Sequence, residues 1–337
     1  MVRISNIYHM LAYAFRSINA GSISTVESEE FENMHDLFAE ILIDGFRKQL
    51  KRGLPRRYVV QKCEFSSLRG KIDVQSSVRQ LTMIRRRLVC EFDVFTEDTP
   101  GNRLIKCAIT YLLKQVDVSP SRKHFLKFLH STLNSVADVL YVKVPTQRVG
   151  GAEYVMLINV CQFLLDGMLM NTGSGYKMRE WLTDEAMSSL YERFLLEYFR
   201  RHHSHFNARS ARIDWDMQEA HANMPEMRSD VFLSYCGKTL IIDAKFYKRI
   251  MSVFYNKKTF HSQNLYQIYT YVKNADKAKD GSVSGMLLYA RTDEDIPQDT
   301  GFDNIIGGNN ICIKSLDLGQ EFTLIRAQLE SIAARLA

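Results

Sequence analysis

Two short apolar runs with a single break between them constrain the fold more than any other feature of this sequence. Val231–Tyr235 and Thr239–Ala244 are rich in β-branched and aromatic residues, and Cys236–Lys238 separates them. Such runs around a glycine-containing break are typical of a β-hairpin. If the first two residues of the break form the turn, Asp230 lies directly opposite Asp243.

The polar residues of this hairpin suggest a catalytic chemistry. Asp243 and Lys245 are two residues apart on one strand and therefore project from the same face. Two neighbouring carboxylates repel each other, and a divalent cation such as Mg²⁺ or Mn²⁺ removes that repulsion. A metal-bound water and an adjacent ammonium group suit attack on a phosphate. The alternative is structural, with Asp230 capping a turn and the other two residues forming a surface ion pair.

A helix predicted at about residues 262–274 follows the hairpin. It carries Gln263, Gln267 and Tyr271 at positions i, i+4 and i+8, which lie on one helical face. We expect their amide and phenol groups to orient the attacking water, the lysine or a phosphate.

The pattern Asp-(x)12-Asp-Ala-Lys resembles the signature of the PD-(D/E)xK nucleases, with Ser229 in place of the usual proline. The Gln-x-x-x-Tyr spacing that ends at Tyr271 resembles the corresponding helix of RecB-like nucleases. More specifically, the chain is similar to the McrC family, the nuclease subunits of McrBC-type (type IV) methylation-dependent restriction systems. The similar segments are residues 4–15, 68–73, 97–106, 241–248, 260–267 and 316–321.

This resemblance implies roles for individual residues. Asp230 and Asp243 would bind Mg²⁺, for which Mn²⁺ can substitute, and the backbone carbonyl of Ala244 would be a further ligand. In this superfamily the preceding helix lends a glutamate to the metal. Glu192 is our first choice for this ligand and Glu197 the alternative, because Glu197 lies at the edge of the apolar stripe of its helix.

The resemblance also implies a function. The protein would be a metal-dependent DNA endonuclease subunit of a modification-dependent restriction complex, acting on double-stranded DNA that contains modified cytosine. Its partner would be an McrB-like AAA+ GTPase, whose activity it stimulates. The sequence contains no G-x-x-x-x-G-K-[ST] phosphate loop of its own, which agrees with a separate motor.

A length of 337 residues favours two domains. We predict an α+β N-terminal domain, residues 1–168, that contains a small β-rich module and docks on the partner. Residues 169–337 would form an α/β restriction-endonuclease-like domain, and Asn171–Gly175 is the predicted linker. The predicted helices are at 4–18, 31–50, 104–113, 119–136, from 151 onward, 184–201, 262–274 and 322–335. The predicted strands are at 58–65, 70–74, 88–95, 212–217, 231–235, 239–244, 285–290 and 309–313.

The composition restricts partners and location. A net charge of +6 is compatible with a polyanionic partner. Arg85–Arg87 is either a solvated face or a contact to phosphate or to an acidic partner, and the basic and aromatic residues of 246–258 suit a grip on a nucleic-acid backbone. Six scattered cysteines without a C-x-x-C pair argue against zinc or iron–sulfur sites. The histidines of 202–205 are more simply explained by a helix end than by a metal.

No apolar run in the sequence reaches the length of a membrane span, so we expect a soluble, cytoplasmic protein without a membrane partner.

Two alternative functions stay open. One is a stand-alone RecB-like exonuclease or repair nuclease, which would cut without GTP or a partner. The other is a non-catalytic adaptor that only regulates an AAA+ motor. The long N-terminal region argues against the first, and intact Asp230, Asp243 and Lys245 argue against the second.

Overall fold

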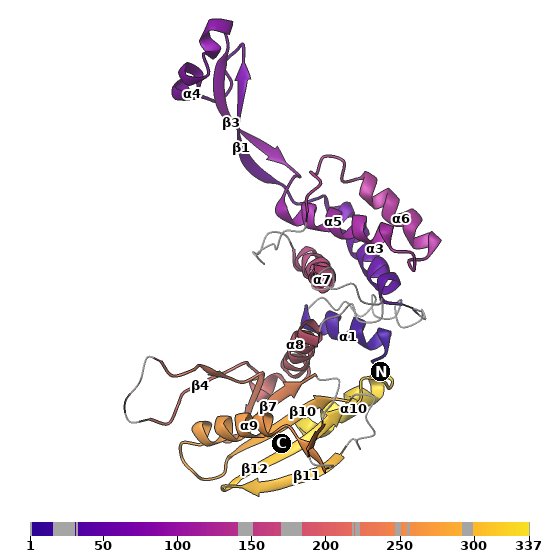
Figure 1. Ribbon diagram of the computed structural model, residues 1–337, viewed down its shortest axis with the longest axis vertical. Helices are drawn as coiled ribbons and strands as arrows, with labels where there is room; N and C mark the ends of the chain where they lie inside the picture. The colour runs from indigo at the N-terminus through magenta and orange to yellow at the C-terminus, as the bar shows by residue number, and fades with distance from the viewer. Residues whose placement is uncertain are drawn as a thin grey trace. The chain divides into compact units, whose positions relative to one another are not determined.

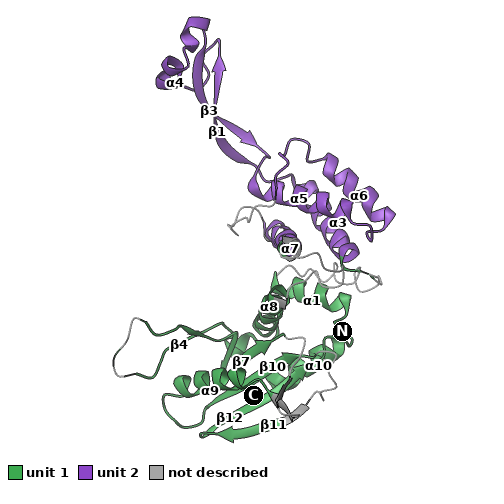
Figure 2. Ribbon diagram, in the orientation of Figure 1, with its two compact units in different colours: residues 1–34, 166–337 green, residues 35–165 purple. Residues whose placement is uncertain are grey.

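The structure is a computed structural model that describes residues 2–15, 31, 33–140, 151–169, 184–217, 219, 223–246, 251–254, 257–291 and 299–336. These residues form two compact units (Figure 2). Unit 1 combines residues 1–34 with residues 166–337, and unit 2 comprises residues 35–165. The chain therefore enters unit 1, leaves it to form unit 2, and returns.

A mixed five-stranded sheet forms the centre of unit 1, with the strand order β11-β12-β10-β7-β6 (Figure 1). β6 and β7 form an antiparallel hairpin, β10 runs parallel to both β7 and β12, and β11 is an antiparallel edge strand. The inner strands are almost wholly buried, as expected for parallel strands covered on both faces. The bounds are β6 (Val231–Tyr235), β7 (Lys238–Lys245), β10 (Val283–Ala290), β11 (Asp299–Ile306) and β12 (Asn309–Leu316).

The helices of unit 1 are α1 (Ile4–Ala14), α8 (Asp184–His202), α9 (Ser262–Ala275) and α10 (Phe322–Ala333). Helix α9 approaches β10 closely because Gly285 has no side chain. A Cβ atom at Gly285 would stand 2.7 Å from Val272 and 2.8 Å from Ile268. This close packing places one face of α9 near the end of the β6–β7 hairpin. Shorter elements are η2 (Ser204–Phe206), β4 (Arg212–Ile213), β5 (Met227–Arg228), β8 (Met251–Phe254) and β9 (Lys257–Phe260).

Helix α1 belongs to unit 1, although its sequence precedes unit 2. The Asn6 side-chain amide donates hydrogen bonds to the carbonyl oxygens of Leu318 and Gln320, and the His9 ring stacks on Phe322 at a centroid distance of 4.0 Å. The units thus divide the chain differently from the predicted domains 1–168 and 169–337. The second boundary falls near residue 166, but the first helix packs with the later unit because its buried side chains find their partners there.

Unit 2 joins a group of helices to a β-ribbon. Its helices are α3 (Met34–Arg52), α5 (Pro100–Lys114), α6 (Pro120–Ser131) and α7 (Ala152–Leu169). The ribbon is a small sheet with the order β1-β3-β2, formed by β1 (Arg57–Phe65), β2 (Lys71–Ile72) and β3 (Leu88–Thr96). At its far end, which we name the tip, lie α4 (Val74–Arg79) and η1 (Thr82–Arg85). The predicted β-rich module is this ribbon with its tip.

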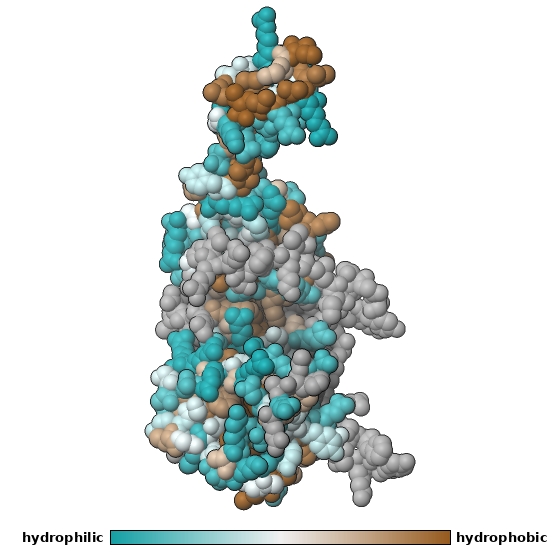
Figure 3. Space-filling view, turned by 90° about the vertical axis from the view of Figure 1, so that its left-hand side faces the viewer, coloured by the Kyte–Doolittle hydropathy of each residue, from teal (hydrophilic) through white to brown (hydrophobic). Residues whose placement is uncertain are grey.

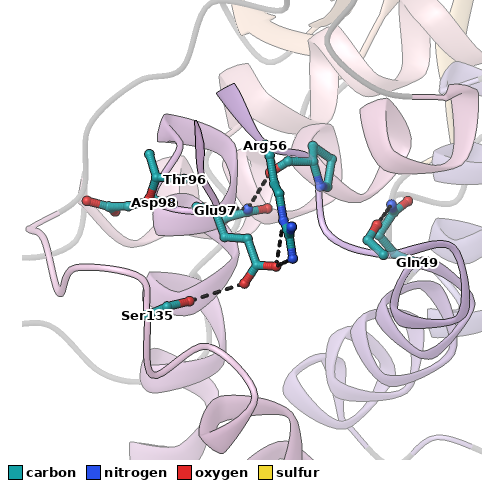
Figure 4. A network of polar contacts seen from close by, with 9 residues as sticks. Gln49, Arg56, Thr96, Glu97, Asp98 and Ser135 are labelled. Carbon is teal, nitrogen blue, oxygen red and sulfur yellow. Dashed lines mark hydrogen bonds and ion pairs between the residues drawn. The ribbon is translucent and has the colours of Figure 1, made fainter. Parts of the chain in front are cut away.

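Polar contacts tie the base of the ribbon to the helices of unit 2 (Figure 4). The Arg56 guanidinium donates two hydrogen bonds to Glu97, at 3.0 and 2.6 Å, and the Ser135 hydroxyl donates to the same carboxylate at 3.2 Å. The Asn102 amide donates to the backbone carbonyls of Pro55 and Glu97, so α5 holds together the two chain segments that flank the ribbon.

The tip exposes apolar side chains, which Figure 3 shows in brown at the top of the molecule. Ile84 is 77% exposed and Leu81 is 62% exposed, although both are large hydrophobic residues. We name this surface the apolar tip patch; its residues are Leu68, Val74, Val78, Leu81, Met83 and Ile84. Arg85 and Arg87 of the triple arginine lie beside it, 3.2 and 3.8 Å from the Glu64 carboxylate.

Several predicted elements differ from the observed ones. The strand predicted at 70–74 is cut short because the Asp73 carboxylate accepts the Ser76 N–H and caps α4. Helix α5 begins at Pro100, four residues before the predicted start, because the Thr99 hydroxyl caps it. The strand predicted at 212–217 is reduced to two residues, and β11 was not predicted. The predicted linker lies outside the described residues, as do residues 247–250 and 255–256 of segment 246–258. None of the described helices combines the length and apolar composition that a membrane crossing requires.

Candidate active site

The β6–β7 hairpin has the predicted register. Cys236 and Gly237 form its two-residue turn with φ of 46° and 81°, the left-handed geometry that matches the twist of the strands. Val231 pairs with Ile242, so the next position places Asp230 opposite Asp243.

The two aspartates occupy different surroundings at the end of the hairpin. Asp230 Oδ2 accepts a hydrogen bond of 2.7 Å from the backbone N–H of Ala244. In a strand, the N–H and C=O of one residue point to the same side. The Ala244 carbonyl therefore points to the same side as its N–H, beyond the end of β6. Asp243 is only 1% exposed, in a strand whose neighbours are apolar.

Lys245 links the hairpin to α9. Its ammonium lies 2.9 Å from Asp243 Oδ2 and donates a hydrogen bond of 3.1 Å to Gln267 Oε1. Gln267 in turn donates from Nε2 to the Tyr271 hydroxyl at 2.8 Å. Two of the three predicted residues of α9 therefore hold the lysine in place. The Gln263 side chain is exposed one turn earlier and makes no hydrogen bond within the described part of the chain.

The electrostatics of the site favour a cation. Burial raises the pKa of Asp230 to about 7, and the charges of Asp243 and Glu192 contribute. Burial also raises the pKa of Asp243, while Lys245 opposes that rise. The site thus favours the neutral forms of these carboxyl groups, and a bound cation would stabilise their ionised forms.

Glu192 and Glu197 have different surroundings on α8. Burial raises the pKa of Glu192, and its charge is close enough to Asp243 and Lys245 for each to influence it. The Ser188 hydroxyl, one turn earlier, donates to its carboxylate at 3.2 Å. Glu197 instead forms an ion pair of 2.7 Å with Arg200. Glu192 is thus coupled to the charges of Asp243 and the lysine.

The donor set of this site fits a hard divalent cation. Asp243 Oδ2 is buried, and no described residue donates it a hydrogen bond of good geometry besides its ion pair with Lys245. Two carboxylates and a backbone carbonyl are oxygen ligands of the kind Mg²⁺ and Mn²⁺ prefer. No three Asp, Glu, His or Cys side chains among the described residues form a ready-made metal site, so Glu192 lies near the two aspartates without completing one.

Sequence reasoning did not identify two residues that support this site. Ser188 donates a hydrogen bond to Glu192. Their i, i+4 spacing on one helix could have predicted this contact. Tyr191 packs against Phe246, the residue after Lys245, with ring centroids 6.2 Å apart. The histidines near 202–205 serve as structural partners instead: His203 lies 3.1 Å from Glu330, and His202 lies 2.9 Å from the Tyr13 hydroxyl.

Comparison with known proteins places the chain in a family. The chain is 27% identical over 342 residues to the type IV methyl-directed restriction enzyme EcoKMcrBC of Escherichia coli K12, which covers 98% of this chain and 97% of that protein. Among solved structures it resembles McrC bound to McrB AAA+ hexamers in a half-complex of a tetradecameric Thermococcus gammatolerans assembly, with a TM-score of 0.54 and 15% identity over 98% of this chain and 75% of that one.

The family described as "McrBC 5-methylcytosine restriction system component" matches residues 4–290, which include α1, all of unit 2 and the hairpin with its aspartates. A match of this extent covers most of both units, and the chain therefore belongs to the McrBC family of 5-methylcytosine restriction system components.

Proposed function

We propose that this protein is the metal-dependent DNA endonuclease subunit of a modification-dependent restriction complex, with a PD-(D/E)xK nuclease fold in unit 1. The observation that carries the proposal is the convergence of Asp230, Asp243 and Lys245 at one end of a buried hairpin. Family membership and the name of the E. coli relative support the same reading. The net charge of +6 suits a DNA substrate.

The residues of the site have separate tasks in this proposal. Asp230 and Asp243 hold Mg²⁺, for which Mn²⁺ substitutes, and the Ala244 carbonyl and Glu192 are the further ligands. Such a cation, when bound, makes a water more nucleophilic and stabilises charge on a phosphoryl oxygen. Lys245 places a positive charge beside the attacked phosphate, and Gln267 and Tyr271 fix the direction of its ammonium.

We propose that the partner is an McrB-like AAA+ GTPase and that unit 2 docks on it. The T. gammatolerans relative of similar fold is bound to McrB AAA+ hexamers. The apolar tip patch supports this role, because contiguous exposed apolar side chains mark interaction surfaces. The polar contacts at the base of the ribbon would keep the tip in a fixed direction relative to the helices of unit 2.

A single cleavage assay tests the function. Plasmid DNA with and without 5-methylcytosine is incubated with the protein, adding or omitting the partner GTPase, Mg²⁺ and GTP. We expect cleavage only with methylated DNA and all three additions. Cleavage without partner and GTP would favour a stand-alone nuclease. Failure to cut in the complete mixture, together with normal stimulation of the GTPase, would favour a non-catalytic adaptor.

A further inference from the structure

Helix α8 lies between the candidate active site and α1, and neighbouring residues of α8 contact each of them. Tyr191 packs on Phe246 beside the site, and Glu192 is electrostatically coupled to the aspartates. The next two residues of α8 contact α1 and the residue that follows it. The Arg193 guanidinium carbon lies 4.9 Å from the centre of the Phe15 ring, and Phe194 meets the Tyr13 ring edge-on at 5.5 Å.

Helix α1 also contacts the segment that leads into α10. Asn6 holds the turn before α10 through hydrogen bonds of 2.8 Å to Leu318 and 2.7 Å to Gln320. His9 lies nearly parallel to Phe322, with an angle of 10° between the ring planes. Phe322 also packs against Phe194 of α8, with ring centroids 6.2 Å apart, so α1, α8 and the start of α10 form one packed group.

Glu192 stands near the aspartates without forming a ready-made three-ligand group. A small displacement of α8 would therefore change how well Glu192 reaches a cation held by the hairpin, and ligand placement is sensitive at about the 1 Å level. We propose that α1 is a positioning element of the active site: by packing on α8, it presents Glu192 to Asp230 and Asp243. This inference rests on the proposed function, because it takes the aspartates as metal ligands.

The test measures Mn²⁺ affinity of the full chain by electron paramagnetic resonance, without DNA or partner. Phe15→Ala removes the ring beneath Arg193, and we expect about two- to tenfold weaker Mn²⁺ binding, in line with the strength of a cation–π contact. Phe15→Tyr keeps the ring and should keep the affinity. Phe125→Ala is the matched control, because it removes a similar contact to Arg47, at 4.4 Å, in unit 2.

Repeating the measurement in a Glu192→Gln background separates positioning from general stability. If α1 acts through Glu192, Glu192→Gln weakens binding and Phe15→Ala adds nothing further. Equal weakening in both backgrounds, or no weakening in either, overturns the inference while leaving the nuclease proposal intact. Absence of Mn²⁺ binding by the unchanged protein, or binding that survives Asp243→Ala, would overturn both.

Discussion

The β6–β7 hairpin and the β1–β3 ribbon are both antiparallel pairs of strands, but they distribute polarity in opposite ways. The hairpin buries Asp243 among apolar neighbours. The ribbon ends in exposed apolar side chains such as Ile84, while its charged residues pair at the surface, as Lys62 does with Asp73 at 2.7 Å. Such surface pairs contribute little stability.

Each arrangement is unfavourable in the isolated chain. The two aspartates of the hairpin share the single ammonium of Lys245, and an exposed apolar patch lacks an apolar surface to cover it. The proposed function assigns a different kind of ligand to each region: a cation to the hairpin and a macromolecule to the tip. Variants that alter one region only should separate these two functions.

The largest expected effect comes from Asp243→Asn, which keeps the shape of the side chain and removes its charge. We expect DNA cleavage to fall about a thousandfold or more, because charge stabilisation by a metal contributes several kcal/mol to phosphate chemistry. Stimulation of the partner GTPase should stay normal. Parallel assays of cleavage and GTP hydrolysis check this; joint loss of both activities would contradict the separation of functions between the two regions.

A smaller effect is expected from Ile84→Glu at the tip. A charge in the centre of an apolar interface should raise the concentration needed for half-maximal GTPase stimulation by about 10- to 100-fold. The melting temperature should not change, because this side chain is already exposed. Val116→Glu is the control, since Val116 is 80% exposed in unit 2 away from the tip patch. Similar effects of the two variants on GTPase stimulation would mean that the tip is not part of the interface with the partner.

The smallest expected effect is on the pH dependence of the melting temperature of the metal-free protein. The pKa of Asp230 is raised to about 7 in the fold, above its value of about 3.9 in an unfolded chain. Its stabilising contribution is complete below about pH 4 and is lost as the pH rises through 7. Between pH 5 and 8 we expect the melting temperature to fall by roughly 2–4 °C more than in Asp230→Asn.

Thermal unfolding in a chelating buffer measures this difference. Identical pH dependence in the two proteins would mean that Asp230 is well solvated. Addition of Mg²⁺ should restore the stability of the unchanged protein at pH 8 and leave the variant unaffected.

The sequence predicted the hairpin and its aspartates because their placement depends on local geometry. A two-residue turn sets the register, and the register alone brings Asp230 opposite Asp243. The face of α9 that holds Lys245 was also predictable, since Gln267 and Tyr271 are one helical turn apart. Gln263 has the same spacing, but its side chain is exposed and makes no hydrogen bond to the lysine. Helical periodicity alone cannot distinguish Gln263 from the other two residues.

Other features depend on contacts between distant segments, which periodicity does not report. A helical wheel left Glu192 and Glu197 as alternatives, and their different surroundings follow from the packing of α8 beside β7 and from the ion pair of Glu197 with Arg200. The place of α1 in unit 1 depends on Asn6 meeting Leu318, more than 300 residues later in the chain. The tip patch also escaped prediction, because apolar residues on such short elements do not reveal whether they are buried or exposed.

The discontinuity of unit 1 has a consequence for biosynthesis. Helix α1 is translated before unit 2, but α8 follows only after 170 further residues, from Ala14 to Asp184. At ribosomal speeds of about 5–20 residues per second, the apolar side chains of α1 wait roughly 10–30 s for their partners. Unit 2 is complete within that interval and can fold first. The fold of unit 1 can thus be completed only after unit 2 has been synthesised.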